Sequence, residues 1–133
     1  MDLKEKELLL KDLCARLPYE VIVNIEYSKE HGSSYRLRVC SEGDLKLNTD
    51  LLGLFIQEKI YLKPYLRPMS SMTEEERAEL YKVGGLMSHK VETDIYVLTA
   101  FSPEAYDWLN AHHFDYRGLL EKGLSLEAKE GMY

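Results

Sequence analysis

Hydrophobic residues recur every three or four positions in the first segment of the chain, residues 3 to 17. The apolar stripe consists of Leu9, Leu10, Leu13, Cys14 and Leu17. This period predicts an amphipathic helix that Pro18 ends, because a proline ring clashes with a continuing helix. We expect Cys14 to be buried as a small apolar side chain and Asp12 to lie on the charged, outward face.

Alternating apolar and polar residues predict strands in the next part of the chain. Residues 21 to 27 have this period, residues 31 to 34 supply turn chemistry, and residues 35 to 39 alternate again. We expect the two alternating segments to pair as a β-hairpin with a loose loop. After a second turn at residues 41 to 44, Leu45 and Leu47 indicate a short third strand.

Residues 60 to 66 alternate as well, with Ile60, Leu62 and Leu66 on one face. The opposite face forms a Lys/Tyr stripe made of Lys59, Tyr61, Lys63, Tyr65 and Arg67. Pro64 has no N–H to donate to a neighbouring strand. We therefore expect this strand to lie at a sheet edge or to end at Pro64.

Capping residues and glycines mark the next elements. Thr73 and Glu76 have the spacing of a capping box, which predicts a helix that runs to about Lys82 and ends at Gly84 and Gly85. Residues 94 to 101 are rich in β-branched and aromatic side chains. That composition predicts a central strand.

Ser102 and Pro103 then open another helix as its N-cap and first residue. The inward stripe of this helix consists of Ala105, Trp108, Leu109 and His112. We expect Asp115 to cap a last short helix that closes at Gly123.

These elements predict an α+β fold: a small, mainly antiparallel sheet of three to five strands with two to four helices, the N-terminal helix packed on the sheet. A chain of 133 residues is long enough for one domain with one core, so we expect a single domain over residues 1–133. The hydrophobic fraction of 45% and charged fraction of 30% are those of an ordinary globular protein.

The net charge of the chain disfavours some classes of binding partner. Seventeen Lys and Arg against 23 Asp and Glu give a net charge of −6, which repels nucleic acid and anionic lipid from the surface as a whole. No apolar run approaches the ~18 residues that a membrane-spanning helix needs, and the charged residues after Met1 do not resemble a signal peptide. We expect a cytoplasmic protein in which Cys14 and Cys40 are reduced.

Three stretches of the chain resemble sequences of known proteins. Residues 12 to 19 read DLCARLPY, residues 63 to 76 read KPYLRPMSSMTEEE, and residues 108 to 124 read WLNAHHFDYRGLLEKGL, with GMY at 131 to 133. With them the chain resembles short uncharacterised proteins encoded by gut bacterial genomes and their phages and mobile elements. That family has no assigned activity, so the resemblance implies a setting, an accessory protein of a mobile or phage-derived region, and no site residues.

His112, His113 and Asp115 form the best candidate cluster for chemistry, because imidazoles and carboxylates bind zinc or exchange protons near neutral pH. Neighbouring helical residues project about 100° apart, so both imidazoles face one ion only if the helix ends between them. The alternative is a helix junction, in which Asp115 caps a helix and the imidazoles bond backbone carbonyls. His31 and His89 lie in predicted loops and can complete a ligand set.

The Lys/Tyr stripe has the form of a platform on which aromatic rings stack the bases of a single-stranded nucleic acid. It is also the ordinary solvent face of an edge strand, where Lys discourages unwanted pairing. We favour another protein as the partner that binds this surface, because Tyr and Arg are enriched at the centres of protein interfaces.

We therefore expect a non-enzymatic protein-interaction module of phage or mobile-element type, with another protein as partner and with no cofactor, catalytic residue or metal. One alternative is a small metal-binding protein or acid/base enzyme centred on His112, His113 and Asp115. The second is a single-strand nucleic-acid binder that uses the Lys/Tyr stripe.

Overall fold

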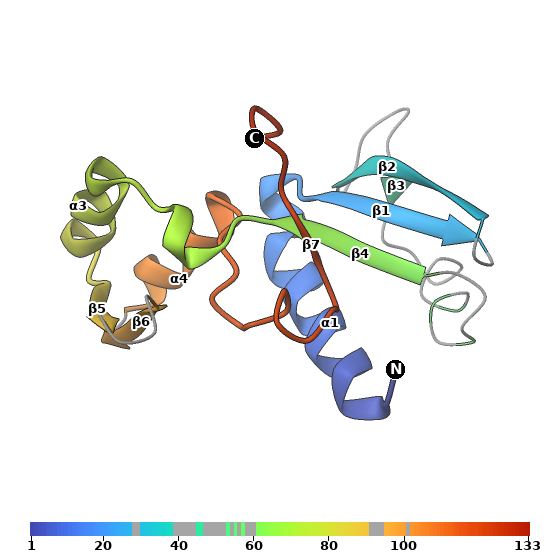
Figure 1. Ribbon diagram of the computed structural model, residues 1–133, viewed down its shortest axis with the longest axis horizontal. Helices are drawn as coiled ribbons and strands as arrows, with labels where there is room; N and C mark the ends of the chain where they lie inside the picture. Colours follow the sequence, from blue (N-terminus) through green and yellow to red (C-terminus); the bar gives the residue numbers. More distant parts are fainter. Residues whose placement is uncertain are drawn as a thin grey trace.

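A computed structural model describes residues 1–27, 30–38, 45–46, 53, 55, 57, 61–90, 95–100 and 102–133. The first half of the chain contains α1 (Leu3–Arg16), η1 (Leu17–Tyr19), β1 (Ile22–Tyr27), β2 (Glu30–Arg38), β3 (Leu45–Lys46) and β4 (Tyr61–Leu66). The second half contains η2 (Met69–Ser71), α3 (Glu74–Lys82), β5 (Leu86–Lys90), β6 (Ile95–Ala100), α4 (Pro103–Ala111) and β7 (Leu126–Glu127). The molecule is elongated, with α3, β5 and β6 at one end and β1, β2 and β3 at the other (Figure 1).

The main sheet has the strand order β3-β2-β1-β4-β7 and α1 packs on it, which confirms the predicted α+β class. The sheet is mixed. β1 pairs antiparallel with β2 and β4, whereas β2 with β3 and β4 with β7 are parallel. The expectation of a mainly antiparallel sheet is confirmed, because the two parallel pairings are each only two residues long.

The prediction that this strand lies at a sheet edge or ends at Pro64 is wrong, because β4 lies between β1 and β7 and continues to Leu66. Pro64 pairs in register with Val23, and alternate pairs of an antiparallel ladder exchange no hydrogen bonds, so a residue without an N–H is tolerated there. On the other side, β7 pairs with Tyr65 and Leu66 and begins beyond Pro64.

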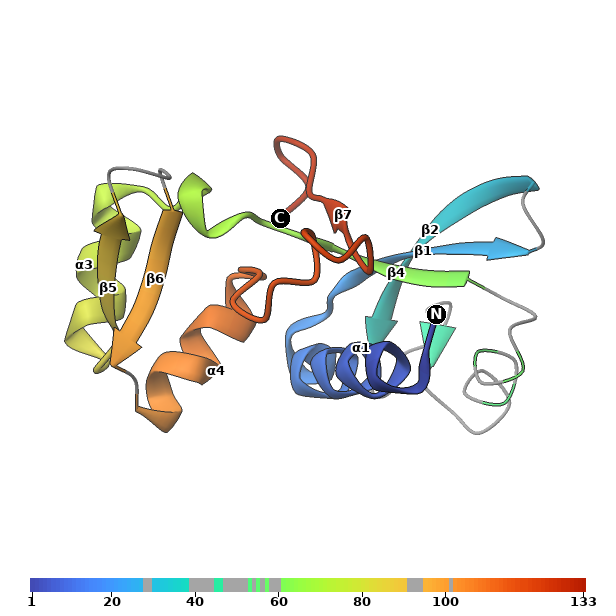
Figure 2. The ribbon, with the colours of Figure 1, turned by 60° about the horizontal axis from the view of Figure 1, so that its bottom comes forward.

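The predicted hairpin is confirmed, with a different turn. Residues 31 to 34 belong to β2, whose first residue Glu30 already pairs with Tyr27. In the second half, β6 confirms the strand predicted at residues 94 to 101, but it pairs with β5 in a separate two-stranded sheet instead of lying at the centre of a larger one. The unpredicted strand β5 lies next to α3 (Figure 2).

Helix ends follow the predicted capping. Thr73 and Glu76 form a capping box at the start of α3. The N–H groups of Gly84 and Gly85 bond the carbonyls of Tyr81 and Leu80 at its end, and Gly84 has a φ of +96°, which only glycine adopts without strain.

None of the helices in the described residues has the length and apolar character that a bilayer crossing requires.

Apolar side chains in the described residues gather in two clusters instead of the one core expected from chain length. The sheet cluster consists of Leu9, Leu13, Val21, Val23, Ile25, Phe55, Leu62, Leu66, Leu119 and Leu124. The α3–α4 cluster consists of Met72, Leu80, Ala105, Leu109 and Phe114. The expectation of one domain over residues 1–133 stays a prediction. It requires that the two clusters be joined by stable contacts.

The inward face of α1 differs from the predicted one. Leu9, Asp12, Leu13 and Arg16 are buried, whereas Cys14 is exposed. These buried positions have the i, i+3, i+4, i+7 spacing of one helix face. The helix is therefore rotated from the expected orientation because a charged pair, and not the thiol, completes its buried stripe.

That charged pair joins the two clusters. Arg16 Nε and Nη2 donate to the two carboxylate oxygens of Asp12 at 2.8 and 3.0 Å, and both side chains have no solvent exposure. Arg16 Nη2 also donates to the carbonyl of Phe114 at 2.6 Å, and Arg117 Nε donates to Asp12 at 3.2 Å. Arg16 thus connects α1, which lines the sheet cluster, to the backbone of a residue in the α3–α4 cluster.

Removing one partner of this pair should be strongly destabilising, because the remaining charge is left buried without its counter-ion. We expect Asp12→Ala to lower the free energy of unfolding by about 3–5 kcal/mol, and the double replacement Asp12→Leu with Arg16→Met to cost clearly less. Urea unfolding followed by circular dichroism measures both. The control is Asp2→Ala, which removes an exposed helix cap worth about 0.5–2 kcal/mol; a loss no larger than this in Asp12→Ala would contradict the role assigned to the pair.

Candidate functional site

The predicted histidine cluster lies where α4 ends. Ser102 caps the start of the helix by accepting the N–H of Ala105, and Pro103 is its first residue, as predicted. At the other end the N–H groups of His113 and Phe114 bond the carbonyls of Asn110 and Leu109. His113 has a φ of +60°, the left-handed conformation that usually belongs to a glycine at this position.

This left-handed turn brings the end of α4 against the end of β4. The N–H of Arg67 donates to the carbonyl of His113 and the N–H of Asp115 donates to the carbonyl of Arg67, both at 2.8 Å. Arg67 thereby pairs with Phe114 as a parallel β-bridge. Two segments far apart in the sequence are locked side by side, and the histidines are fixed beside the sheet.

Asp115 has the predicted capping role. Its two carboxylate oxygens accept the N–H groups of Leu119 and Leu120 at 2.8 and 2.9 Å. The segment that it caps is a turn, closed by Gly123 with a φ of +70°, and not the short helix expected. Both oxygens of Asp115 are therefore engaged by the backbone.

The two histidines have different surroundings. His112 stacks on Trp108, with ring centroids 3.9 Å apart, and its Nδ1 lies 2.9 Å from the Trp108 carbonyl. A carbonyl only accepts, so Nδ1 carries a hydrogen in this contact. His113 is buried and stacks on Tyr133 at 3.7 Å. Among the described residues no group of three or more His, Cys, Asp and Glu side chains can hold a metal ion.

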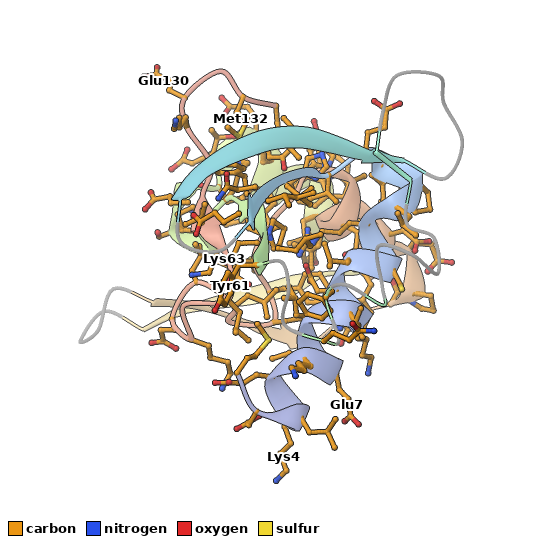
Figure 3. All side chains as sticks on the ribbon, turned by 90° about the vertical axis from the view of Figure 1, so that its right-hand side faces the viewer. Lys4, Glu7, Tyr61, Lys63, Glu130 and Met132 are labelled. Carbon is orange, nitrogen blue, oxygen red and sulfur yellow. The ribbon has the colours of Figure 1, made fainter. Side chains whose placement is uncertain are left out.

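The Lys/Tyr stripe is not one continuous exposed face. Tyr61 is exposed and Lys63 is half-buried, and both project from β4 on the same side (Figure 3). Tyr65 is buried, and Arg67 turns toward α3. Lys59, together with the side chains of His31 and His89, lies outside what the structure describes.

Two side chains hold the guanidinium of Arg67. Its Nη1 and Nη2 donate to the two carboxylate oxygens of Glu76, both at 2.7 Å, and its guanidinium lies 4.1 Å from the centre of the Phe114 ring. The hydrogen bond from Arg67 lowers the pKa of Glu76 from an ordinary value of 4.5 to about 2, and the backbone N–H of Thr73 adds to this against the opposing effect of burial. Arg67 is thereby a fixed, charge-compensated part of the surface.

Tyr133 closes this region from the far end of the sequence. Its hydroxyl accepts the N–H of Ile22 at 2.9 Å and donates to the carbonyl of Tyr65 at 2.7 Å. Each hydrogen bond is worth about 0.5–1.5 kcal/mol net, so these contacts and the His113 stacking hold the segment after β7 against the sheet.

Two cavities are both lined by Arg67 and Tyr133. The histidine cavity, of about 330 Å³, is lined by Tyr19, Glu20, Arg67, Ala111, His112, His113 and Tyr133. The tail cavity, of about 470 Å³, is lined by Arg67, Pro68, Ser71, Glu127, Ala128, Lys129, Glu130, Gly131 and Tyr133. Together they form the candidate site, which joins the predicted histidines to one residue of the Lys/Tyr stripe and does not include Asp115.

Sequence reasoning missed Tyr19, Glu20 and Tyr133 as members of this site. Each lies in a segment without periodicity, where side-chain direction cannot be inferred from spacing. Comparison of the chain with protein-family models, with curated proteins and with solved structures found no match in any of the three.

The low pKa of Glu76 predicts a pH dependence of stability. A carboxylate whose folded-state pKa lies below its unfolded value stabilises the fold above about pH 4.5, and this contribution is lost as the pH falls from 4.5 toward 2. We expect Glu76→Gln to lower the free energy of unfolding at pH 7 by about 1 kcal/mol, because solvent partly screens the Arg67–Glu76 pair. The substitution should also flatten the dependence of stability on pH between 4.5 and 2. Thermal unfolding across this range is the measurement. Glu75→Gln, on the same exposed turn, is the control and should keep the acid slope; a slope unchanged in Glu76→Gln would contradict the assignment.

Proposed function

We propose that this protein is a non-enzymatic interaction module, an accessory protein of phage or mobile-element type, that binds a segment of another protein in the two cavities around Tyr133. The observation that carries the proposal is the adjacency of these cavities, which share Arg67 and Tyr133. The two cavities have volumes of about 470 and 330 Å³.

The residue types of the walls favour a protein ligand. Tyr19 and Arg67 belong to the residue classes that dominate binding energy in protein interfaces. His112 and His113 add flat rings and hydrogen-bonding nitrogens, and the lining carries acidic as well as basic groups. A mixed, aromatic-rich lining suits a polypeptide segment better than a polyanion.

The walls are also held in place before any partner binds. Arg67 is fixed by Glu76 and by the Phe114 ring, and His112 is fixed by the Trp108 carbonyl and ring. Because immobilising loose side chains costs free energy on binding, walls of this kind favour affinity.

We favour this function over the two alternatives on specific grounds. A metal or acid/base centre would draw on Asp115, whose two oxygens accept backbone N–H groups beside the histidines. A nucleic-acid platform would draw on Tyr65, which is buried, and on Arg67, which is paired with Glu76.

Site-directed photo-crosslinking tests the proposal. A benzoylphenylalanine placed at Ser71 or Lys129, both exposed in the tail cavity, should crosslink one defined segment of a bacterial protein. The same group at Lys4, which lies on the opposite side of the molecule from Glu130 and Met132, should not (Figure 3). Equal crosslinking from all three positions would contradict a localised site.

The segment identified in this way can then be measured as a peptide. We expect Tyr19→Ala to weaken its affinity about tenfold, the loss typical of an interface anchor. Tyr81→Ala is the matched control, because Tyr81 is an exposed tyrosine on α3 that lies outside both cavities. Loss of affinity in the control as large as in Tyr19→Ala would remove the cavities from the proposal.

A further inference from the structure

The hydroxyl of Tyr133 occupies a position inside the sheet. The β1–β4 ladder ends with Val23 opposite Pro64, so the next pair in register would be Ile22 and Tyr65. Alternation makes that next pair a hydrogen-bonded one, in which the Ile22 N–H would bond the Tyr65 carbonyl directly. Instead the phenolic oxygen lies between them, 2.9 Å from the nitrogen and 2.7 Å from the oxygen.

This position selects the chemistry of its occupant. One atom must both accept a hydrogen bond from Ile22 and donate one to Tyr65, which a hydroxyl does and a carboxylate or an ammonium does not. The group must also be carried on a flat ring, because His113 stacks on it at 3.7 Å with 16° between the planes. Serine lacks the ring and phenylalanine lacks the hydroxyl. The seat formed by Ile22, Tyr65 and His113 therefore matches a tyrosine side chain.

The present occupant sits at the surface. Tyr133 is 41% exposed, although its hydroxyl both accepts one hydrogen bond and donates another. The preceding residues Lys129, Glu130 and Gly131 are exposed and form a loop closed by the Met132 N–H on the Lys129 carbonyl. Tyr133 lines both cavities, so a second chain segment in either cavity lies next to it.

We propose that this seat is a recognition site for a tyrosine side chain of the partner segment, and that Tyr133 is an internal occupant which the partner's tyrosine replaces. This inference rests on the proposed function and names the chemistry of its partner. The segment that carries Tyr133 then acts as a strap that closes over the seat when no partner is bound.

Chemical rescue tests the seat without knowledge of the partner. In Tyr133→Ala, p-cresol should bind the vacated seat and raise the melting temperature with increasing concentration. Toluene, which lacks the hydroxyl, should bind at least tenfold more weakly, and the wild-type protein should respond less than the variant to either compound. Equal effects of p-cresol and toluene, or no binding of p-cresol, would overturn the assignment.

Tyr133→Phe covers the case in which the alanine variant does not fold. It keeps the ring and removes the hydroxyl, so N-acetyl-tyrosinamide should compete with it more easily than with Tyr133. We expect the Ile22 amide resonance to shift on titration with N-acetyl-tyrosinamide, with a dissociation constant several-fold lower in Tyr133→Phe than in wild type. An Ile22 resonance that stays in place in both proteins would overturn the assignment.

The two proposals fail in different ways. If the crosslinked partner peptide binds equally well after its own tyrosines are replaced by phenylalanine, the tyrosine seat is overturned and the interaction module stands. If p-cresol binds Tyr133→Ala as expected while crosslinking is the same from Ser71, Lys129 and Lys4, the seat is supported and the proposed function is lost.

Discussion

The contact between Asp12 and Arg16 is the interaction on which the arrangement of this protein depends. Both side chains are fully buried one helical turn apart on α1, and the guanidinium extends from the sheet cluster to the carbonyl of Phe114 in the α3–α4 cluster. A buried ion pair rarely adds net stability over an apolar pair, but it imposes one geometry, since any other leaves a charge without a partner. Here that geometry includes the hydrogen bond from Arg16 to the Phe114 carbonyl, which connects the two clusters.

The candidate site lies directly on this junction. Phe114, which Arg16 holds, is bracketed by His113 and Asp115, and the backbone of these two residues bonds Arg67 at the end of β4. Arg67 reaches across to Glu76 on α3, and Tyr133 returns to β1 and β4 through Ile22 and Tyr65. The walls of both cavities thus come from segments that are distant in sequence and are assembled by backbone bonds around one buried guanidinium.

Local chemistry in the sequence predicted much of the fold and less of the site. Thr73 with Glu76, Ser102 with Pro103, and Asp115 are capping signals whose partners lie within five residues, so spacing is sufficient to find them. The burial of Asp12 and the exposure of Cys14 depend on Phe114 and Arg117, about a hundred residues away, and no period on α1 reports them. The prediction made from Pro64 failed for a related reason. Whether a proline is tolerated inside a sheet depends on its register, which here places it opposite Val23.

Native-state hydrogen exchange tests most directly whether Arg16 unites the two clusters. If it does, the amides of Val23 in the sheet and Leu109 in α4 should exchange in the wild-type protein through one opening with the same free energy. Replacement of Arg16 by methionine should separate them, with Leu109 exchanging through a smaller opening than Val23. Two distinct opening free energies already present in the wild type, and unchanged by the substitution, would contradict the account.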